Sequence, residues 1–128
     1  SGMKAPKYFF TNIKRHGALL AKGRMLGIQF DTLFTDELYF KISHHAINMA
    51  TRIRSIFQKH GIAIAYDSPT NQQFVVLSPS LYEALSKKVA FEIWERKSDT
   101  EIICRFVTSW ATKDKELDEL DDILQALS

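Results

Sequence analysis

The chain has 128 residues, a hydrophobic fraction of 45%, a charged fraction of 25% and a formal net charge of +2. This is the composition of an ordinary globular protein, and so small a charge gives no indication of a nucleic acid or an anionic membrane as partner. No apolar run approaches the roughly 20 residues that a membrane span needs, and no secretory signal is visible, so a cytoplasmic location is predicted. Cys104 is the only cysteine, which excludes an internal disulfide and a cysteine-based metal site.

The N-terminal part is predicted to be helical but interrupted. Apolar residues from about Tyr8 to Phe34 follow a helical stripe, which is broken at Gly17, Gly23 and Gly27. Each glycine inside a helix costs roughly 1 kcal/mol relative to alanine. Either the helix therefore breaks near Gly17 or Gly23, or its backbone lies close against another surface.

The middle of the chain contains the clearest helix. It is predicted from Leu38 to His60, where apolar residues recur at spacings of three and four, and Gly61 is expected just past its end. Strands are predicted at Ile62–Tyr66 and Gln72–Leu77, with a turn between them.

The C-terminal half is predicted to hold a hairpin between two helices. Ser78 and Pro79 are typical of a helix start. The runs Val89–Arg96 and Glu101–Thr108 are rich in β-branched and aromatic residues and flank a polar turn, which indicates a β-hairpin. Thr112 is expected to cap the last helix. These elements predict an α+β fold in which helices pack on one face of a short antiparallel sheet of about four strands.

The two faces of the predicted hairpin differ in polarity. If residues 97–100 form the loop, Arg96 lies opposite Glu101 and Glu92 lies opposite Arg105, so opposite charges meet twice. Strand alternation gives one apolar face, expected to be core, which carries Val89, Phe91, Ile93, Ile102, Cys104 and Phe106.

Arg105 lies on the other, mixed face and is the most informative residue of the chain. A partly desolvated guanidinium needs an anion for its planar fork of donors. That anion is either Glu92 across the strand pair or the carboxylate of a ligand, which the fork can bind with two parallel hydrogen bonds. Trp94 and Trp110 would provide an apolar wall for a ligand, or they are ordinary core or rim residues.

No self-sufficient active site is visible. The sequence contains neither a glycine-rich phosphate loop nor a serine nucleophile turn. His44 and His45 are adjacent and would point about 100° apart on a helix, so they cannot form a pair of metal ligands, and no metal is expected. Cys104 falls on the core face and is interpreted as a buried apolar residue rather than a nucleophile.

Several stretches resemble a known family. Residues Arg15–Phe30, Leu38–Phe40, Asp67–Phe74 and Arg105–Thr112 are similar to the C-terminal third of the threonine aldolase and β-eliminating lyase family. Its members are pyridoxal-phosphate enzymes of the aspartate-aminotransferase-like superfamily. The resemblance implies an interdomain helical segment at residues 3–34 and a C-terminal small domain at 35–128, whereas residues 1–2 are interpreted as the remnant of an expression tag.

The resemblance also implies roles for particular residues. Arg105 would bind the α-carboxylate of the substrate, and the border of the active site would include Arg15, Lys22, Arg24 and Trp110. No catalytic residue is implied, because the lysine that carries the cofactor belongs to a large domain that precedes this segment. Since the cofactor stabilises the carbanion, the isolated chain is expected to bind no pyridoxal phosphate and to be inactive, as a fragment or a truncated product.

The implied reaction is the cleavage of a β-hydroxy amino acid to glycine and an aldehyde, as in low-specificity threonine aldolase. Alternatives are β-elimination or transamination, whose substrates share the carboxylate, and a stand-alone binding or assembly module. Pyridoxal phosphate is implied as cofactor of the full-length enzyme, an amino acid as its substrate, and a homo-oligomer as its assembly. The apolar N-terminal segment also predicts self-association, through Tyr8, Phe9, Phe10, Phe30 and Phe34.

Overall fold

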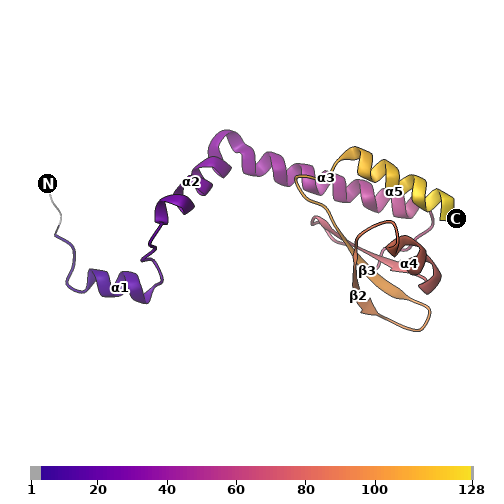
Figure 1. Cartoon of the computed structure of the whole chain (residues 1–128), viewed down its shortest axis with the longest axis horizontal. Helices are drawn as coiled ribbons and strands as arrows, with labels where there is room; N and C mark the ends of the chain where they lie inside the picture. The colour runs from indigo at the N-terminus through magenta and orange to yellow at the C-terminus, as the bar shows by residue number, and fades with distance from the viewer. Residues whose placement is uncertain (1–3, 128) are drawn as a thin grey trace. The chain divides into compact units, whose positions relative to one another are not determined.

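The computed structural model describes residues 4–127 as helices and one sheet (Figure 1). The chain divides into two compact units between Tyr39 and Phe40. The first unit holds α1 (Phe9–Arg15), α2 (Gly23–Phe34) and the 3-10 turn η1 (Thr35–Glu37). The helix α3 (Leu38–Lys59) begins at the boundary, and the second unit continues with β1 (Gln72–Leu77), α4 (Pro79–Ser86), β2 (Glu92–Arg96), β3 (Ile102–Val107) and α5 (Asp114–Leu127).

The N-terminal helical segment is broken, as predicted. α1 ends at Arg15 and α2 begins at Gly23, and Gly17 between them adopts a φ of 65°, a left-handed conformation that favours glycine. A Cβ atom added at Gly27 would meet no atom within 4 Å. The alternative explanation, a close approach of the backbone to another surface, therefore has no support within the described residues.

The sheet has three antiparallel strands in the order β1-β3-β2, so the expectation of about four strands is wrong by one. The segment predicted as a strand at Ile62–Tyr66 forms only an isolated bridge, between Ile64 and Val75. Two backbone hydrogen bonds flank this bridge, from Ala65 to Phe74 (2.8 Å) and from Val76 to Ala63 (2.9 Å). The pairing stops there because the end of α3 lies directly before this segment and the turn that leads to β1 directly follows it.

The hairpin forms where it is predicted, with a changed register at its end. Glu92 lies opposite Arg105, as predicted, but Arg96 lies opposite Ile102 rather than Glu101. The register shifts between Ile93 and Glu95. An irregularity of this kind gives one strand an extra residue and slips every later pair by one position.

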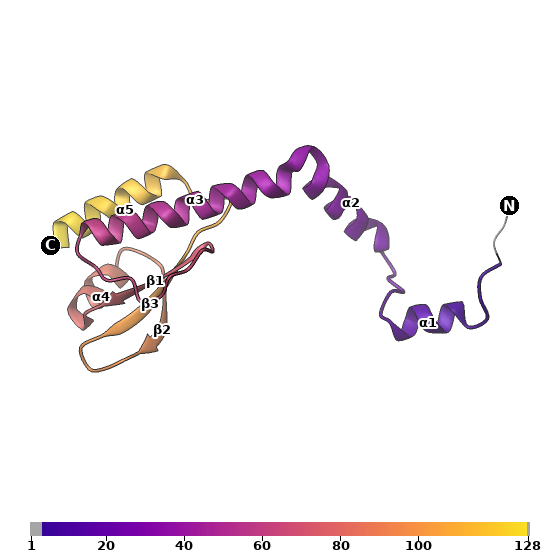
Figure 2. The same ribbon diagram turned by 180° about the vertical axis from the view of Figure 1, so that it is seen from behind.

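The core lies between one face of the sheet and the helices of the second unit. Figures 1 and 2 show α3 and α5 side by side over the sheet. Residues with no exposed surface come from most of these elements, namely Phe57, Val75, Leu77, Leu85 and Cys104. The predicted core face of the hairpin is correct for Ile102, Cys104 and Phe106, which are buried, but not for Ile93, which is 39% exposed because β2 is an edge strand.

The ends of the shorter helices also differ in detail from the prediction. Ser78 caps α4, and its Oγ accepts a hydrogen bond from the amide of Leu81 at 3.3 Å. Thr112 does not cap α5: its Oγ1 accepts from the amide of Ser109 at 2.9 Å, and the helix begins two residues later, at Asp114.

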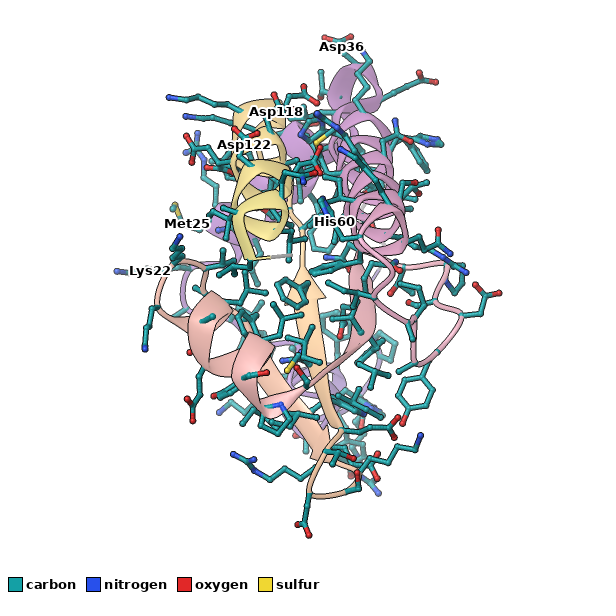
Figure 3. The ribbon with its side chains drawn as sticks, turned by 90° about the vertical axis from the view of Figure 1, so that its right-hand side faces the viewer. Lys22, Met25, Asp36, His60, Asp118 and Asp122 are labelled. Atoms are coloured by element: carbon teal, nitrogen blue, oxygen red, sulfur yellow. The ribbon has the colours of Figure 1, made fainter. Side chains whose placement is uncertain are left out.

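Ion pairs connect α3 to α5. Arg52 pairs with Asp114 and Asp118. The carboxylate of Asp121 contacts both Nζ of Lys59, at 2.7 Å, and Nε2 of His60, at 2.6 Å. Figure 3 shows Asp118 and Asp122 on α5 and His60 near the end of α3. The hydrogen bond from Lys59, and then the one from His60, lower the pKa of Asp121. The acidic run of α5 is therefore partly engaged with the neighbouring helix.

We expect Asp121→Asn to lower the free energy of unfolding at neutral pH. The folded-state pKa of Asp121 is depressed, so its stabilising contribution is present above the unfolded-state value of about 3.9 and is lost as the pH falls through the folded-state value. Urea denaturation at a series of pH values should give a constant difference between the two proteins down to about pH 5, which then shrinks below about pH 4.

Asp122→Asn is the matched control, because it removes the same charge from an exposed neighbouring position. A difference between the Asp121→Asn protein and the unaltered protein that does not change with pH would contradict a contribution from the ionised carboxylate.

Candidate substrate-binding site on the open face of the sheet

Arg105 lies on the central strand, on the face of the sheet that points away from the core. Its neighbours across the strand pairs are Phe74 on β1 and Glu92 on β2. The side chain of Arg105 is 27% exposed. The helices α3 and α5 pack on the opposite face (Figures 1 and 2). The face of Arg105 is not covered by these helices, although Ile103 on the same face is only 3% exposed.

The guanidinium of Arg105 has partners on both neighbouring strands. Its Nη2 donates to Oε2 of Glu92, and its Nη1 donates to Oε1 of Gln72 at 3.3 Å. Its Cζ lies 5.4 Å from the ring centroid of Trp94, within the range of a cation–π interaction. Its Nε is buried and has no hydrogen-bond partner among the described residues. Because Nε is inaccessible, only the edge formed by Nη1 and Nη2 is left for a carboxylate that approaches from solvent.

The ion pair with Glu92 that the hairpin register predicts is therefore formed. It does not enclose the guanidinium, because the Glu92 side chain is 69% exposed. Exposed pairs of this kind contribute about 0–1 kcal/mol. The pair and a carboxylate-binding role are thus compatible at this position.

Aromatic side chains form a wall beside Arg105. The rings of Tyr66 and Phe74 lie 5.6 Å apart in an edge-to-face arrangement, and those of Phe74 and Trp94 lie 5.2 Å apart in the same way. The hydroxyl of Tyr66 donates to Oε2 of Glu95 at 3.2 Å. Desolvation, followed by this hydrogen bond, raises the pKa of Tyr66. This surface therefore offers one cationic fork beside an apolar wall.

Gln72, Phe74 and Tyr66 are members of this site that the sequence does not single out. Gln72 and Phe74 occupy alternate positions of β1, and both face Arg105 only because β1 pairs with β3. The alternation within β1 places them on one face, but nothing local indicates which strand is the neighbour.

Trp110 lies on the loop after β3 and is 69% exposed. That loop is held by Thr108, which is 1% exposed and whose Oγ1 donates to the carbonyl of Ala46 on α3 at 2.7 Å. The Nε2 of His45 lies 2.7 Å from the carbonyl oxygen of Thr112 at the other end of the loop. The loop is therefore attached to α3 on both sides of Trp110.

The remaining residues expected at the border of an active site belong to the first unit. Arg15 is the last residue of α1, Lys22 directly precedes α2, and Arg24 is its second residue. All three side chains are exposed. Their proximity to Arg105 stays a prediction.

Cys104 is buried in the core on the face opposite Arg105. Burial raises the pKa of its thiol to about 11, so the thiol is protonated at neutral pH and is not suited to act as a nucleophile. Among residues 4–127, no group of three or more His, Cys, Asp or Glu side chains is arranged to hold a metal ion. No helix in this part of the chain is long and apolar enough to cross a membrane.

The described residues do not fit a pyridoxal-phosphate site. A lysine that forms an imine with the cofactor is activated by desolvation or by a neighbouring cation, and every lysine in residues 4–127 is exposed. These residues therefore offer no lysine suited to hold that cofactor.

Comparisons with known proteins find a match among solved structures. No model of a protein family matches the chain, and no curated protein does. Among solved structures, a threonine aldolase from Leishmania major is 34% identical in sequence and superposes with a TM-score of 0.84. The match covers 95% of this chain and 36% of that chain, so the chain spans about a third of the length of that protein. The resemblance inferred from the sequence is thus confirmed: the chain is related, over nearly all of its length, to part of a threonine aldolase.

Proposed function

We propose that this chain is the C-terminal part of a pyridoxal-phosphate lyase of the threonine aldolase type, which cleaves a β-hydroxy amino acid to glycine and an aldehyde. The cofactor and its lysine are then supplied by a large domain outside these residues, and the role of this part is to bind the substrate and to contribute contacts in the oligomer. The carbanion chemistry is the work of the cofactor.

One observation carries the proposal: Arg105 lies on the central strand, on the face away from the core, with a partly exposed side chain and aromatic rings beside it. A bidentate carboxylate contact needs the edge formed by Nη1 and Nη2. The 34% identity to a threonine aldolase supports cleavage of a β-hydroxy amino acid as the reaction that such a site would serve.

The test is an assay of threonine cleavage in two proteins. With added pyridoxal phosphate, the 128-residue chain should produce acetaldehyde no faster than free cofactor does. The product of the full reading frame, if it includes a large domain with its lysine, should turn over threonine. Turnover by the 128-residue chain, or a complete reading frame that cleaves no β-hydroxy amino acid, would contradict the proposal.

We also propose that the first unit takes part in homo-oligomer contacts. Its large apolar side chains are exposed to an unusual degree, including Phe10 (68%) and Phe30 (63%). Clusters of exposed apolar side chains mark interaction surfaces. The chain should therefore associate with itself in light scattering, and the substitutions Phe10→Asp and Phe30→Asp should shift it towards the monomer.

Trp110→Asp is the control for self-association, because Trp110 is equally exposed (69%) but lies in the second unit. An unaltered chain that stays monomeric at high protein concentration would contradict the oligomer proposal.

A further inference from the structure

The carboxylate of Glu92 accepts a hydrogen bond from Nη2 of Arg105, one of the two atoms that a substrate carboxylate would use. We propose that Glu92 is a displaceable counter-ion: it pairs with Arg105 when no substrate is bound and must leave when a carboxylate ligand arrives. This inference rests on the proposed function, and it adds a residue that sets substrate affinity by competing for the guanidinium.

The competition follows from the bonding of the guanidinium. Nε is buried, so only Nη1 and Nη2 remain for a ligand, and Nη2 already donates to Glu92. A second carboxylate bound to Nη1 and Nη2 would share Nη2 with Glu92, and two like charges so close together repel each other. Binding of the ligand therefore requires that Glu92 give up its contact.

The position of Glu92 allows it to leave at small cost. It lies on the edge strand β2, and its side chain is 69% exposed, so a released carboxylate regains its hydration. Arg105 would stay in place, because Gln72 and Trp94 contact it independently of Glu92. The fork is thus already oriented when the counter-ion departs, which reduces the ordering cost of binding.

A supporting role for Glu92 predicts the opposite change in carboxylate affinity when its charge is removed. If Glu92 were a positioning residue that holds the guanidinium in a productive orientation, removal of its charge would weaken the binding of carboxylates. If it is a competitor, removal of its charge strengthens binding. The sign of one measured change therefore separates the two roles.

The direct test uses the 128-residue chain with acetate as a probe carboxylate at constant ionic strength. The Nε–Hε signal of Arg105 in a nitrogen–proton NMR spectrum, identified by its loss in Arg105→Lys, reports binding. We expect Glu92→Gln to lower the apparent Kd for acetate about two- to fivefold, which is the range expected when a largely exposed ion pair no longer competes for the guanidinium. Glu92→Thr, which suits a strand and cannot reach the guanidinium, should do the same.

The matched control is Glu83→Gln, which removes the same charge from an exposed position of α4. This helix buries Leu85 in the core on the opposite side of the sheet. The Kd of the Glu83→Gln protein for acetate should therefore stay unchanged. Circular dichroism of each variant checks the fold. An unchanged or weaker affinity in both Glu92 variants would overturn the inference.

The full-length enzyme separates a failure of this inference from a failure of the proposed function. There, Glu92→Gln should lower the KM for threonine about two- to fivefold, whereas Arg105→Lys should raise it. If Arg105→Lys impairs the enzyme but Glu92→Gln does not lower KM, only the counter-ion role is wrong. If Arg105→Lys leaves kcat/KM unchanged, the carboxylate-binding role of Arg105 is itself wrong, and this inference falls with it.

Discussion

Replacement of Arg105 by lysine in the full-length enzyme is expected to lower kcat/KM for the amino-acid substrate roughly 30- to 900-fold. This factor corresponds to a loss of about 2–4 kcal/mol of transition-state stabilisation. The physical reason is geometric. A guanidinium presents two parallel N–H donors to a carboxylate, whereas a lysine ammonium is a compact, strongly hydrated point charge that cannot reproduce the pair.

The loss should appear in both kinetic constants. A misplaced carboxylate weakens binding, which raises KM, and it also moves the reacting bonds away from their productive orientation, which lowers kcat. Steady-state kinetics with threonine measure both effects. Arg96→Lys is the matched control, because it makes the same substitution at an exposed position of the same hairpin. An unchanged kcat/KM in the Arg105→Lys enzyme would leave the ion pair with Glu92 as the only role of Arg105.

Replacement of Phe57 by alanine is expected to lower the free energy of unfolding by about 3–5 kcal/mol. Phe57 has no exposed surface, and its ring lies 4.8 Å from that of Phe106 on β3, so it connects α3 to the central strand. The substitution removes the transfer free energy of the ring and leaves a cavity that the surrounding helices cannot fill. Since small domains are stable by only about 5–15 kcal/mol, much of the total would be lost.

Urea denaturation followed by circular dichroism measures this change in the 128-residue chain. Trp110→Ala is the control, because it truncates a large aromatic side chain that is 69% exposed, and exposed sites usually change stability by less than about 0.5 kcal/mol. A loss of under about 1 kcal/mol for Phe57→Ala would show that the ring is not enclosed as the structure has it.

The sequence and the structure agree where the signal is local. The apolar periodicity from Leu38 places α3 to within one residue at its C-terminal end, because a helix is defined by contacts three and four residues apart. The break at Gly17 is predictable for the same reason, since the cost of glycine in a helix is local. The Glu92–Arg105 pair follows from a short hairpin loop and strand alternation.

The differences arise where a structural feature depends on distant residues. The short segment at Ile62–Tyr66 has the composition of a strand, but only Ile64 pairs, because the neighbouring helix end and turn limit it. The register shift after Ile93 turns Arg96 away from its predicted partner, and no residue pattern in the hairpin marks its position. Ile93 has an apolar side chain, and its 39% exposure follows from the place of β2 at the edge of the sheet.

The candidate site also combines features that follow from local sequence with features that depend on distant residues. The sequence by itself determined the α+β class, the long helix, the hairpin and the position of Arg105 opposite Glu92, because each follows from residues near one another in the chain. Only the tertiary structure decided that β3 is the central strand, which brings Gln72 and Phe74 from β1 to the guanidinium. Residues 72 and 105 lie far apart in the sequence, and they meet because β1 and β3 pair while one face of each strand is buried in the core. Such pairing between distant strands is selected by the packing of the whole unit rather than by local preference.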